Sequence, residues 1–337
     1  MDTTTSTTTT TNTATTMRAV VQNRYGSSEV LRLTQVPVPA VGPNDVLVRV
    51  HAAGLDRGTE HLMTGKPYAM RPVTGLSRPK NPVSGRDVAG TVAEVGSAVT
   101  RFAVGDEVYG IAPGSFAEYA VAPEAKLARK PANLGFAQAA VVPVSAGTAL
   151  QALQDVGRVA EHQSVLVLGA SGGVGTYAVQ LAKAFGAEVT GVCSTPKLDL
   201  VTSLGADHVI DYTREDFADG SRRYDLILDI AGSPSLRRLR RALAPRGTAV
   251  FVGAEDAGNL IGMGRQLRGA LASPFLRQRL ALLMAKERGA DYERLTTLIE
   301  AGQVTPSLDR TFSLEDAPGA MRLLETGQVR GKVAITV

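Results

Sequence analysis

The sequence predicts an α/β protein in which a barrel-like domain of short strands precedes a doubly wound parallel sheet. Up to about residue 128, short strand-like segments alternate with glycines and prolines, whereas from residue 129 onward apolar strands alternate with helical segments. One of the later strands leads into a glycine-rich turn and then a helix. A chain of 337 residues is also long enough to form two domains.

The first sixteen residues differ in kind from the rest, because eleven of them are threonine and only Met1 and Ala14 are apolar. Residues 1–16 are therefore predicted to form a disordered tail that buries nothing. The stretch has no basic residue and no apolar centre, so it is unlike a secretory signal or a mitochondrial presequence. A plastid transit fragment is the alternative, and we expect a cytoplasmic protein.

The predicted β domain begins at Met17. Short strands separated by glycine turns are typical of a small barrel. The strand-like segments in this part of the chain are 18–35, 45–52, 86–95, 107–111 and 116–121.

From residue 129 to about residue 285 the pattern becomes βαβ, which predicts a parallel, doubly wound sheet. The predicted strands are 164–168, 188–193, 207–210, 225–230 and 247–253. The predicted helices are 147–157, 174–186, 197–204 and 233–243. A helix-rich stretch is expected over 277–302, and strand-like segments that rejoin the first domain are expected at 306–312 and 332–337.

The glycine-rich turn carries the first functional signal. An apolar strand, Val165–Leu168, is followed by Ala170-x-Gly172-x-x-Gly175, which opens a helix. This context is typical of a Rossmann dinucleotide site, where backbone N–H groups at a helix N-terminus bind the pyrophosphate; an ordinary βα turn is the alternative. Gly172 would allow the pyrophosphate to approach, and Gly175 would let the helix pack on the strand. Pyrophosphate contacts are predicted from Ser171, Gly172, Gly173 and Val174.

The end of the second strand of that sheet predicts which dinucleotide binds. An NAD site would place Asp or Glu there for the ribose 2′-hydroxyl, whereas this chain has Cys193, followed by Ser194 and Lys197. A hydroxyl and an ammonium would bind the 2′-phosphate that an acid would repel, so we expect NADPH as the cofactor. A solvated Lys197 is the alternative. Ends of two further strands are expected to line the same site, at Ala231, Gly232, Val252 and Gly253.

Composition and charge argue against several other classes of protein. The net charge of +4 is spread along the chain, so no specific nucleic-acid partner is expected. No apolar run reaches the roughly 18 residues that span a bilayer, so no transmembrane segment is expected. The single cysteine excludes an internal disulfide. Residues 264–288 mix arginines with leucines, and would form either a sixth strand with its helix or a surface that docks on a membrane or partner.

Several motifs occur in the order that one protein family shows. They are Val50-His-Ala-Ala-Gly54, Gly85-Arg-Asp-Val-Ala-Gly90, Val104-Gly-Asp-Glu-Val108, Phe116-Ala-Glu-Tyr119, Pro143-Val-Ser-Ala-Gly-Thr148, the glycine turn, Leu204-Gly-Ala-Asp-His-Val-Ile-Asp-Tyr212 and Arg330-Gly-Lys-Val333. Over residues 18–337 the chain resembles the zinc-independent branch of the medium-chain dehydrogenase/reductases, the quinone oxidoreductase-like proteins. The resemblance implies a GroES-like catalytic domain at 17–128, completed by about 286–337, and a Rossmann NADP-binding domain at 129–285. It leaves open whether the chain forms a homodimer.

The same resemblance bears on metal binding. Zinc-dependent relatives carry a cysteine ligand where this chain has Asp56, and Gly-His-Glu where it has Gly85-Arg86-Asp87. Arginine does not lose its proton to bind a metal, and catalytic zinc needs three protein ligands. The four histidines show no ligand spacing. No zinc or other metal site is therefore predicted.

Without a Lewis acid, hydride delivery to a conjugated acceptor is easier than alcohol oxidation, because the negative charge spreads over an enolate or a quinone ring. The predicted reaction is NADPH-dependent reduction of a quinone or an α,β-unsaturated carbonyl compound (an enone). The resemblance implies Thr148 near the nicotinamide, Tyr212 near the adenosine and Lys332 in the cofactor site. Asp56 stands where the family often has asparagine, and His61 stands where some relatives have a pocket tyrosine. Both are predicted catalytic residues, and His61 would orient or protonate the acceptor.

Two alternatives concern single residues, and two concern the function of the whole protein. The Thr148 hydroxyl would serve equally as a helix cap, and His61 as a surface residue. A non-catalytic NADPH-binding protein that docks on a partner, a membrane or RNA would need the same phosphate site. A carbonyl reductase of the alcohol dehydrogenase type is the second alternative function.

Overall fold

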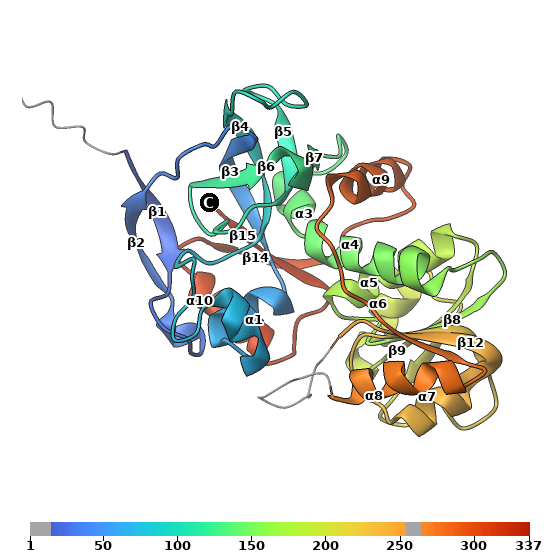
Figure 1. Cartoon of the computed structure of the whole chain (residues 1–337). Helices are drawn as coiled ribbons and strands as arrows, with labels where there is room; N and C mark the ends of the chain where they lie inside the picture. Colours follow the sequence, from blue (N-terminus) through green and yellow to red (C-terminus); the bar gives the residue numbers. More distant parts are fainter. Residues whose placement is uncertain (1–14, 254–263) are drawn as a thin grey trace, which may run out of the picture.

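The computed structural model describes residues 15–253 and 264–337, which form two domains side by side (Figure 1). One domain is built on a seven-stranded sheet and the other on a six-stranded parallel sheet, which is the predicted α/β architecture. Residues 1–14, most of the expected disordered tail, lie outside the described residues. Thr16, expected to belong to that tail, is instead the first residue of β1 (Thr16–Val21), where it pairs with Pro37.

The seven-stranded sheet is assembled from both ends of the chain. Its order is β14-β15-β3-β4-β5-β7, and β6 pairs with the first half of β3. Its strands are β3 (Asp45–Leu55), β4 (Asp87–Val95), β5 (Glu107–Ile111), β6 (Tyr119–Pro123), β7 (Leu127–Arg129), β14 (Leu308–Ser313) and β15 (Lys332–Thr336). Val333 lies opposite Leu55 in the antiparallel β15–β3 pair. The C-terminal strands therefore complete the sheet that the N-terminal part of the chain begins.

The segment 18–35, expected to be strand-like throughout, is interrupted. β1 ends at Val21, a short 3-10 turn follows at Ser28–Val30, and β2 (Arg32–Pro37) pairs back on β1. Gly26 lies in the interruption, and glycine in a strand pattern marks such breaks.

Helix α1 (Arg57–Thr64) follows β3, although the strand-like pattern of this region does not predict it. The Asp56 carboxylate accepts a hydrogen bond of 2.8 Å from the N–H of Thr59, which caps the helix N-terminus. Gly65 ends the helix in the left-handed conformation, with φ of 63°. α3 (Phe136–Ala140) and α10 (Ala317–Glu325) are further helices that the prediction lacks.

The parallel sheet has the strand order β10-β9-β8-β11-β12-β13. Its strands are β8 (Ser164–Leu168), β9 (Glu188–Cys193), β10 (His208–Asp211), β11 (Tyr224–Asp229), β12 (Leu243–Phe251) and β13 (Arg279–Leu282). Helices α5 (Gly173–Ala184) and α6 (Leu198–Ser203) cover one face, where Val165 and Val167 are buried. α7 (Leu236–Ala242) covers the other face, over Leu166 and Leu168. In this order a ligand is expected at the carboxyl ends of β8 and β11, where the chain direction of the crossovers reverses.

Three predicted helices differ in their limits. The helix expected at 147–157 begins earlier, as α4 (Pro143–Gln151), and its last turns at Ala152–Gly157 are π-helical. Proline suits a first helical position because its missing N–H would have no acceptor there. α7 is shorter than 233–243 because the Ser235 hydroxyl caps it. The stretch 277–302, expected to be rich in helix, holds β13 before α9 (Gly289–Glu300).

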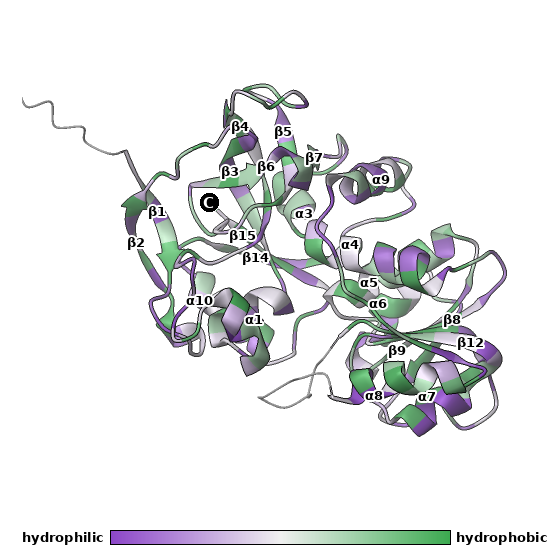
Figure 2. Ribbon diagram, viewed as in Figure 1, coloured by the Kyte–Doolittle hydropathy of each residue, from purple (hydrophilic) through white to green (hydrophobic). Residues whose placement is uncertain are grey.

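The basic stretch 264–288 contains α8 (Gly264–Ala272) and β13, so the interpretation as a strand with its helix is confirmed. Figure 2 shows hydrophobic residues along the strands of both sheets and a mixture of hydrophobic and hydrophilic residues on α7 and α8. Leu271 and Phe275 are exposed to 74% and 89%. Within 15–253 and 264–337, no helix is long and apolar enough to cross a membrane.

The two domains share one core. Ala52 and Ala89 from the first sheet belong to the same buried cluster as Val142 and Ala146 at the start of α4. The hydroxyl of the buried Tyr109 donates a hydrogen bond of 2.6 Å to the carbonyl oxygen of Tyr292 on α9. This bond links β5 of the first sheet to α9.

Candidate functional site

The glycine turn has the geometry of a phosphate site. The N-terminus of α5 begins at Gly173, with Gly172 as its N-cap. A Cβ at Gly175 would lie 2.1 Å from the carbonyl oxygen of Gly169, so only glycine lets helix and strand pack this closely. A Cβ at Gly172 would meet no atom closer than 3.5 Å, which leaves its outer side open. The first amides of a 12-residue helix lack intrahelical acceptors, so this turn fits a dinucleotide pyrophosphate.

The strand that should set the cofactor preference ends without an acid. Cys193 is buried, and burial raises the pKa of its thiol to about 11, so the thiol carries no charge near neutrality. Ser194 follows as a half-buried residue, and Tyr212 on the neighbouring strand end is 62% exposed. The nearby acid, Asp211, accepts hydrogen bonds of 2.5 Å from the Thr195 hydroxyl and 2.7 Å from the Thr213 hydroxyl.

Lys197 does not lie free at the surface. Its ammonium donates hydrogen bonds to the carbonyl oxygens of Gly327 (3.1 Å) and Val329 (2.8 Å). Burial lowers the pKa of Lys197, and the positive charge of Arg330 lowers it further. Arg330 donates to the carbonyl oxygen of Pro196 and pairs with Asp199 at 2.7 Å. Arg330 is therefore a second cation at the end of β9. The sequence around Lys197 does not indicate it, because Arg330 lies more than 130 residues further along the chain.

The ends of β11 and β12 lie beside the turn. The N–H of Ala231 donates to the carbonyl oxygen of Leu168 at 3.3 Å, which brings Ala231 and Gly232 next to β8. Gly232 has φ of 87°, and a Cβ there would meet nothing within 4 Å. Val252 and Gly253 follow β12, and their N–H groups donate to the carbonyl oxygen of Asp229. All four predicted residues therefore lie at carboxyl ends of strands.

The three predicted catalytic residues lie on two elements. Asp56 is 7% exposed, and its Oδ2 atom has no hydrogen-bond partner among the described residues. His61 is half-buried on α1, and its ring makes no hydrogen bond with the part of the chain that the structure describes. Thr148 lies inside α4 rather than at its start, so the alternative in which its hydroxyl caps the helix is wrong. No hydrogen bond or ion pair joins these three side chains within the described ranges.

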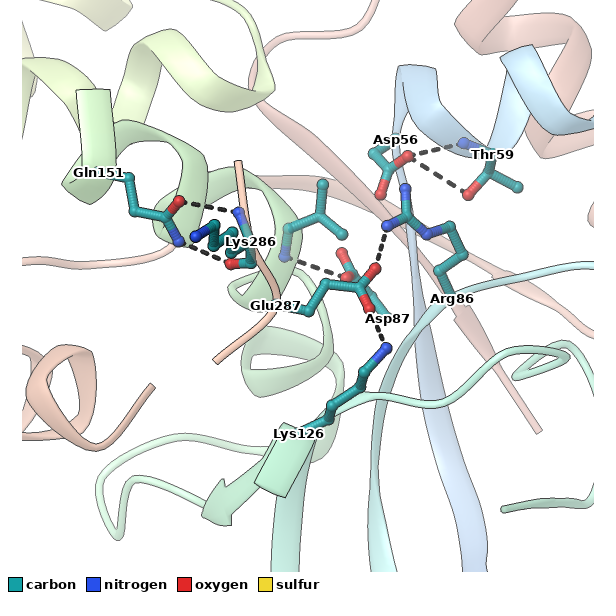
Figure 3. A network of polar contacts seen from close by, with 9 residues as sticks. Asp56, Thr59, Arg86, Asp87, Lys126, Gln151, Lys286 and Glu287 are labelled. Carbon is teal, nitrogen blue, oxygen red and sulfur yellow. Dashed lines mark hydrogen bonds and ion pairs between the residues drawn. The ribbon is translucent and has the colours of Figure 1, made fainter. Parts of the chain in front are cut away.

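A polar network that the sequence argument did not anticipate lies beside Asp56 (Figure 3). Arg86 pairs with Glu287, and Glu287 also accepts a bond of 2.5 Å from the Lys126 ammonium. Burial alone would raise the pKa of Glu287, but its bonds and the charges of these two cations outweigh burial and lower it. Gln151 anchors the chain next to Glu287 through two hydrogen bonds to the backbone of Lys286.

Asp87 and Lys332 form the buried end of this network. Asp87 is fully buried and accepts a bond of 3.0 Å from the N–H of Val144. The Lys332 ammonium donates to the carbonyl oxygen of Leu55 (2.8 Å) and the Ser145 hydroxyl (2.9 Å), and it lies 3.9 Å from Asp87. Burial raises the pKa of Asp87 to about 8, the charge of Asp56 adds to this, and Lys332 opposes it. The aliphatic stem of Lys332 lies against the glycine turn, where a Cβ at Gly173 would be 3.0 Å from its Cδ atom. The expected contact of Lys332 with a cofactor stays a prediction.

The fold and the glycine turn define a two-domain dinucleotide-binding protein, and the comparisons agree. A family model described as "Alcohol dehydrogenase GroES-like domain" matches residues 42–132, and one described as "Zinc-binding dehydrogenase" matches residues 204–335. The "NAD(P)H oxidoreductase RTN4IP1, mitochondrial" of Mus musculus is 34% identical over 362 residues, which cover 96% of this chain and 90% of that protein. The "NADPH-dependent alkenal/one oxidoreductase, chloroplastic" of Arabidopsis thaliana is 35% identical over 334 residues, covering 95% and 79%.

Among solved structures, the quinone oxidoreductase from Coxiella burnetii matches with a TM-score of 0.84 at 30% identity, covering 96% of this chain and 100% of that one. This chain belongs to the medium-chain dehydrogenase/reductase superfamily, in its quinone oxidoreductase-like group, a family of NAD(P)H-dependent oxidoreductases. The names of both relatives given above place those proteins in organelles, and the cytoplasmic location expected for this chain stays a prediction.

Although one matching family is described as zinc-binding, the described residues contain no group of three or more His, Cys, Asp or Glu side chains that could hold a metal ion. Metal independence nevertheless stays a prediction, to be tested by metal analysis of the purified protein.

A pair of glycine variants tests the glycine turn. Gly175→Ala should lower the free energy of unfolding by about 1–3 kcal/mol, because its Cβ would overlap backbone atoms of Gly169 and Ala170. Gly172→Ala should leave stability nearly unchanged but weaken NADPH binding at least about 10-fold, because a methyl group would stand where the pyrophosphate approaches. Urea unfolding and fluorescence titration measure the two effects. Equal stability losses in both variants would contradict the assignment.

Asp87 predicts a pH dependence of stability. A carboxyl group whose pKa rises on folding to about 8 keeps a proton that the unfolded chain has released. Its contribution to stability is therefore lost as the pH rises from about 4 towards 8. The unaltered protein should lose unfolding free energy between about pH 5 and pH 8, and Asp87→Asn should make this loss smaller by about 1–3 kcal/mol. Asp219→Asn, at an exposed position, is the control and should leave the slope unchanged.

Proposed function

We propose that this protein is an NADPH-dependent reductase that transfers hydride to a quinone or an enone. The observation that carries the proposal is the arrangement at the carboxyl end of β9. This strand end has a buried neutral thiol instead of an acid. Lys197 lies in the short turn that follows Ser194, and the Arg330 guanidinium bonds to the carbonyl oxygen of Pro196 in the same turn. A 2′-phosphate would receive hydrogen bonds and charge there, whereas a ribose hydroxyl would find no carboxylate acceptor at Cys193.

The choice of acceptor follows from the residues beside α1. Arg86 and Asp56 stand where zinc-dependent relatives have ligands, and a guanidinium group does not bind a metal. Hydride transfer to the β-carbon of an enone places the negative charge on a delocalised enolate, which requires hydrogen-bond donors rather than a Lewis acid. The names of the Arabidopsis and Coxiella proteins include alkenal/one and quinone acceptors, which supports the same choice here.

The remaining site residues complete the proposal. Ser171, Gly172, Gly173 and Val174 would hold the pyrophosphate, which leaves the nicotinamide near Thr148 on α4. His61 lies on α1 and would face the acceptor, where an imidazole suits proton transfer near neutral pH. The bound cofactor supplies the hydride, while these residues position both reactants and exclude water.

The cofactor preference is tested by removing the two cations one at a time. Lys197→Ala and Arg330→Ala should each raise the dissociation constant of NADPH by roughly 10-fold or more and leave that of NADH nearly unchanged, since each removes a charge-assisted phosphate contact. Lys183→Ala, which removes a surface pair with Asp207, is the matched control. If the unaltered protein binds NADH and NADPH equally well, the assignment is wrong.

The reaction is tested by following NADPH oxidation with a panel of quinones, enones, saturated ketones and alcohols. We expect turnover with quinones or enones that persists after treatment with a chelator. Turnover restricted to saturated carbonyls or alcohols would favour the carbonyl reductase alternative. Tight NADPH binding without turnover of any acceptor would favour a non-catalytic protein.

A further inference from the structure

We propose that Arg86 is a catalytic residue that binds the carbonyl oxygen of the acceptor and stabilises the negative charge that forms on it. This inference rests on the proposed function, because it requires an acceptor with such an oxygen. It adds a residue that the sequence argument treated only as the reason for the absence of a metal.

The guanidinium group is fixed at one end and unengaged at the other. Its Nη2 atom pairs with Glu287, which Lys126 holds from the opposite side. Its Nε and Nη1 atoms make no hydrogen bond with any residue that the structure describes. The side chain is 26% exposed, so these donors are near solvent and accessible to a ligand. A purely structural arginine would be expected to use more of its five N–H groups.

The free end of Arg86 faces the first turn of α1, as Figure 3 shows for Arg86 and Asp56. A Cβ at Gly58 would lie 2.8 Å from Arg86 Nη1 and 2.9 Å from Asp56 Oδ1. Gly58 has no positive φ, so its backbone does not require glycine. The absence of a side chain at Gly58 instead allows the guanidinium and the carboxylate to approach the first turn of α1 this closely.

Asp56 and Glu287 keep this cation charged and in place. Burial would lower the pKa of Arg86, but the negative charges of Asp56 and Glu287 outweigh burial and raise it. The second carboxylate oxygen of Asp56, buried and without a partner among the described residues, attracts the guanidinium towards α1. The group is therefore a permanent, preorganised donor of hydrogen bonds, which is the property that oxyanion stabilisation requires.

The step balances without a further reagent. When bound, the cofactor would supply a hydride with its electron pair, and a C–H bond would form at the β-carbon of an enone. The C=C π electrons move to form an enolate, whose oxygen accepts hydrogen bonds from Arg86. A proton from His61 or from solvent would then complete the α-carbon, the cofactor would be left oxidised, and Arg86 would keep all its protons. With a quinone, the oxyanion is that of the hydroquinone, and water protonates it.

Variants of Arg86 and Lys126 distinguish a catalytic role of Arg86 from a purely structural role. Arg86→Gln should lower kcat for enones on the order of 10²-fold, the loss expected for one oxyanion donor, while NADPH binding stays within about 3-fold. Lys126→Gln breaks the other half of the Glu287 pairing and should leave kcat within about 3-fold of the unaltered protein. Added guanidinium ion should restore part of the turnover of Arg86→Ala but not alter Lys126→Gln. Equal losses in Arg86→Gln and Lys126→Gln would overturn the assignment.

Gly58→Ala gives a test that does not depend on breaking an ion pair. Its methyl group would displace the flexible end of Arg86, so turnover should fall about 10-fold or more. The melting temperature should stay equal or rise, because alanine is favoured over glycine in a helix. Unchanged turnover with a raised melting temperature would count against the inference.

A binding experiment keeps the inference testable even without turnover. With NADP⁺ present, 4-nitrophenolate serves as a stable planar oxyanion whose binding is followed by its absorbance. Its affinity should fall about 10-fold in Arg86→Gln and remain unchanged in Lys126→Gln. Phenolate binding that depends on Arg86, in a protein that reduces no acceptor, would support the oxyanion site and overturn only the proposed reaction. Phenolate binding that is equal in all three proteins would overturn the inference itself.

Discussion

The buried ammonium of Lys332 is the constraint on which the rest of the site depends. Its side chain is 1% exposed, and it bonds to the end of β3 through Leu55 and to α4 through Ser145. A buried charge costs several kcal/mol unless it is paired and hydrogen-bonded, so these groups cannot separate without exposing or orphaning it. Its aliphatic stem passes 3.0 Å from where a Cβ of Gly173 would be. Lys332 therefore contacts three elements at once: the glycine turn, the seven-stranded sheet and α4.

The segment that contains Lys332 extends this constraint to both ends of the dinucleotide site. The N–H of Gly331 donates to the carbonyl oxygen of Ser171 in the glycine turn, at 3.0 Å. The carbonyl oxygen of Val329 holds the ammonium of Lys197 beyond the end of β9. The segment that leads into β15 of the seven-stranded sheet thus touches the turn and the lysine of the other domain. Residues 327–332 therefore contact both the glycine turn and Lys197.

Local patterns in the sequence were sufficient for the parallel sheet but not for the polar network. The strand, turn and helix around Gly172 lie within about twenty consecutive residues, and Gly175 packs as its spacing predicts. Arg330 and Glu287 meet partners more than a hundred residues away, so nothing in the neighbouring sequence indicates their contacts. Helix α1 did carry local signals, a capping Asp56 and a terminal Gly65, but Asp56 was interpreted as a catalytic residue at the position of a zinc ligand in relatives, and not as a helix cap. Similarly, the apolar run before Thr148 concealed that α4 begins at Pro143.

The charges around Arg86 explain why an arginine is compatible with this position in the fold. Asp56 and Glu287 would leave an excess of negative charge beside α1 if Arg86 were neutral, and their charges raise the pKa of Arg86 despite its burial. A guanidinium group neutralises this excess with one permanent positive charge and directs its remaining donors towards α1. It polarises an oxygen less strongly than a divalent ion does, because its charge is smaller and more delocalised. Such a site is best suited to acceptors whose negative charge is already delocalised, which is the chemical property that quinones and enones share.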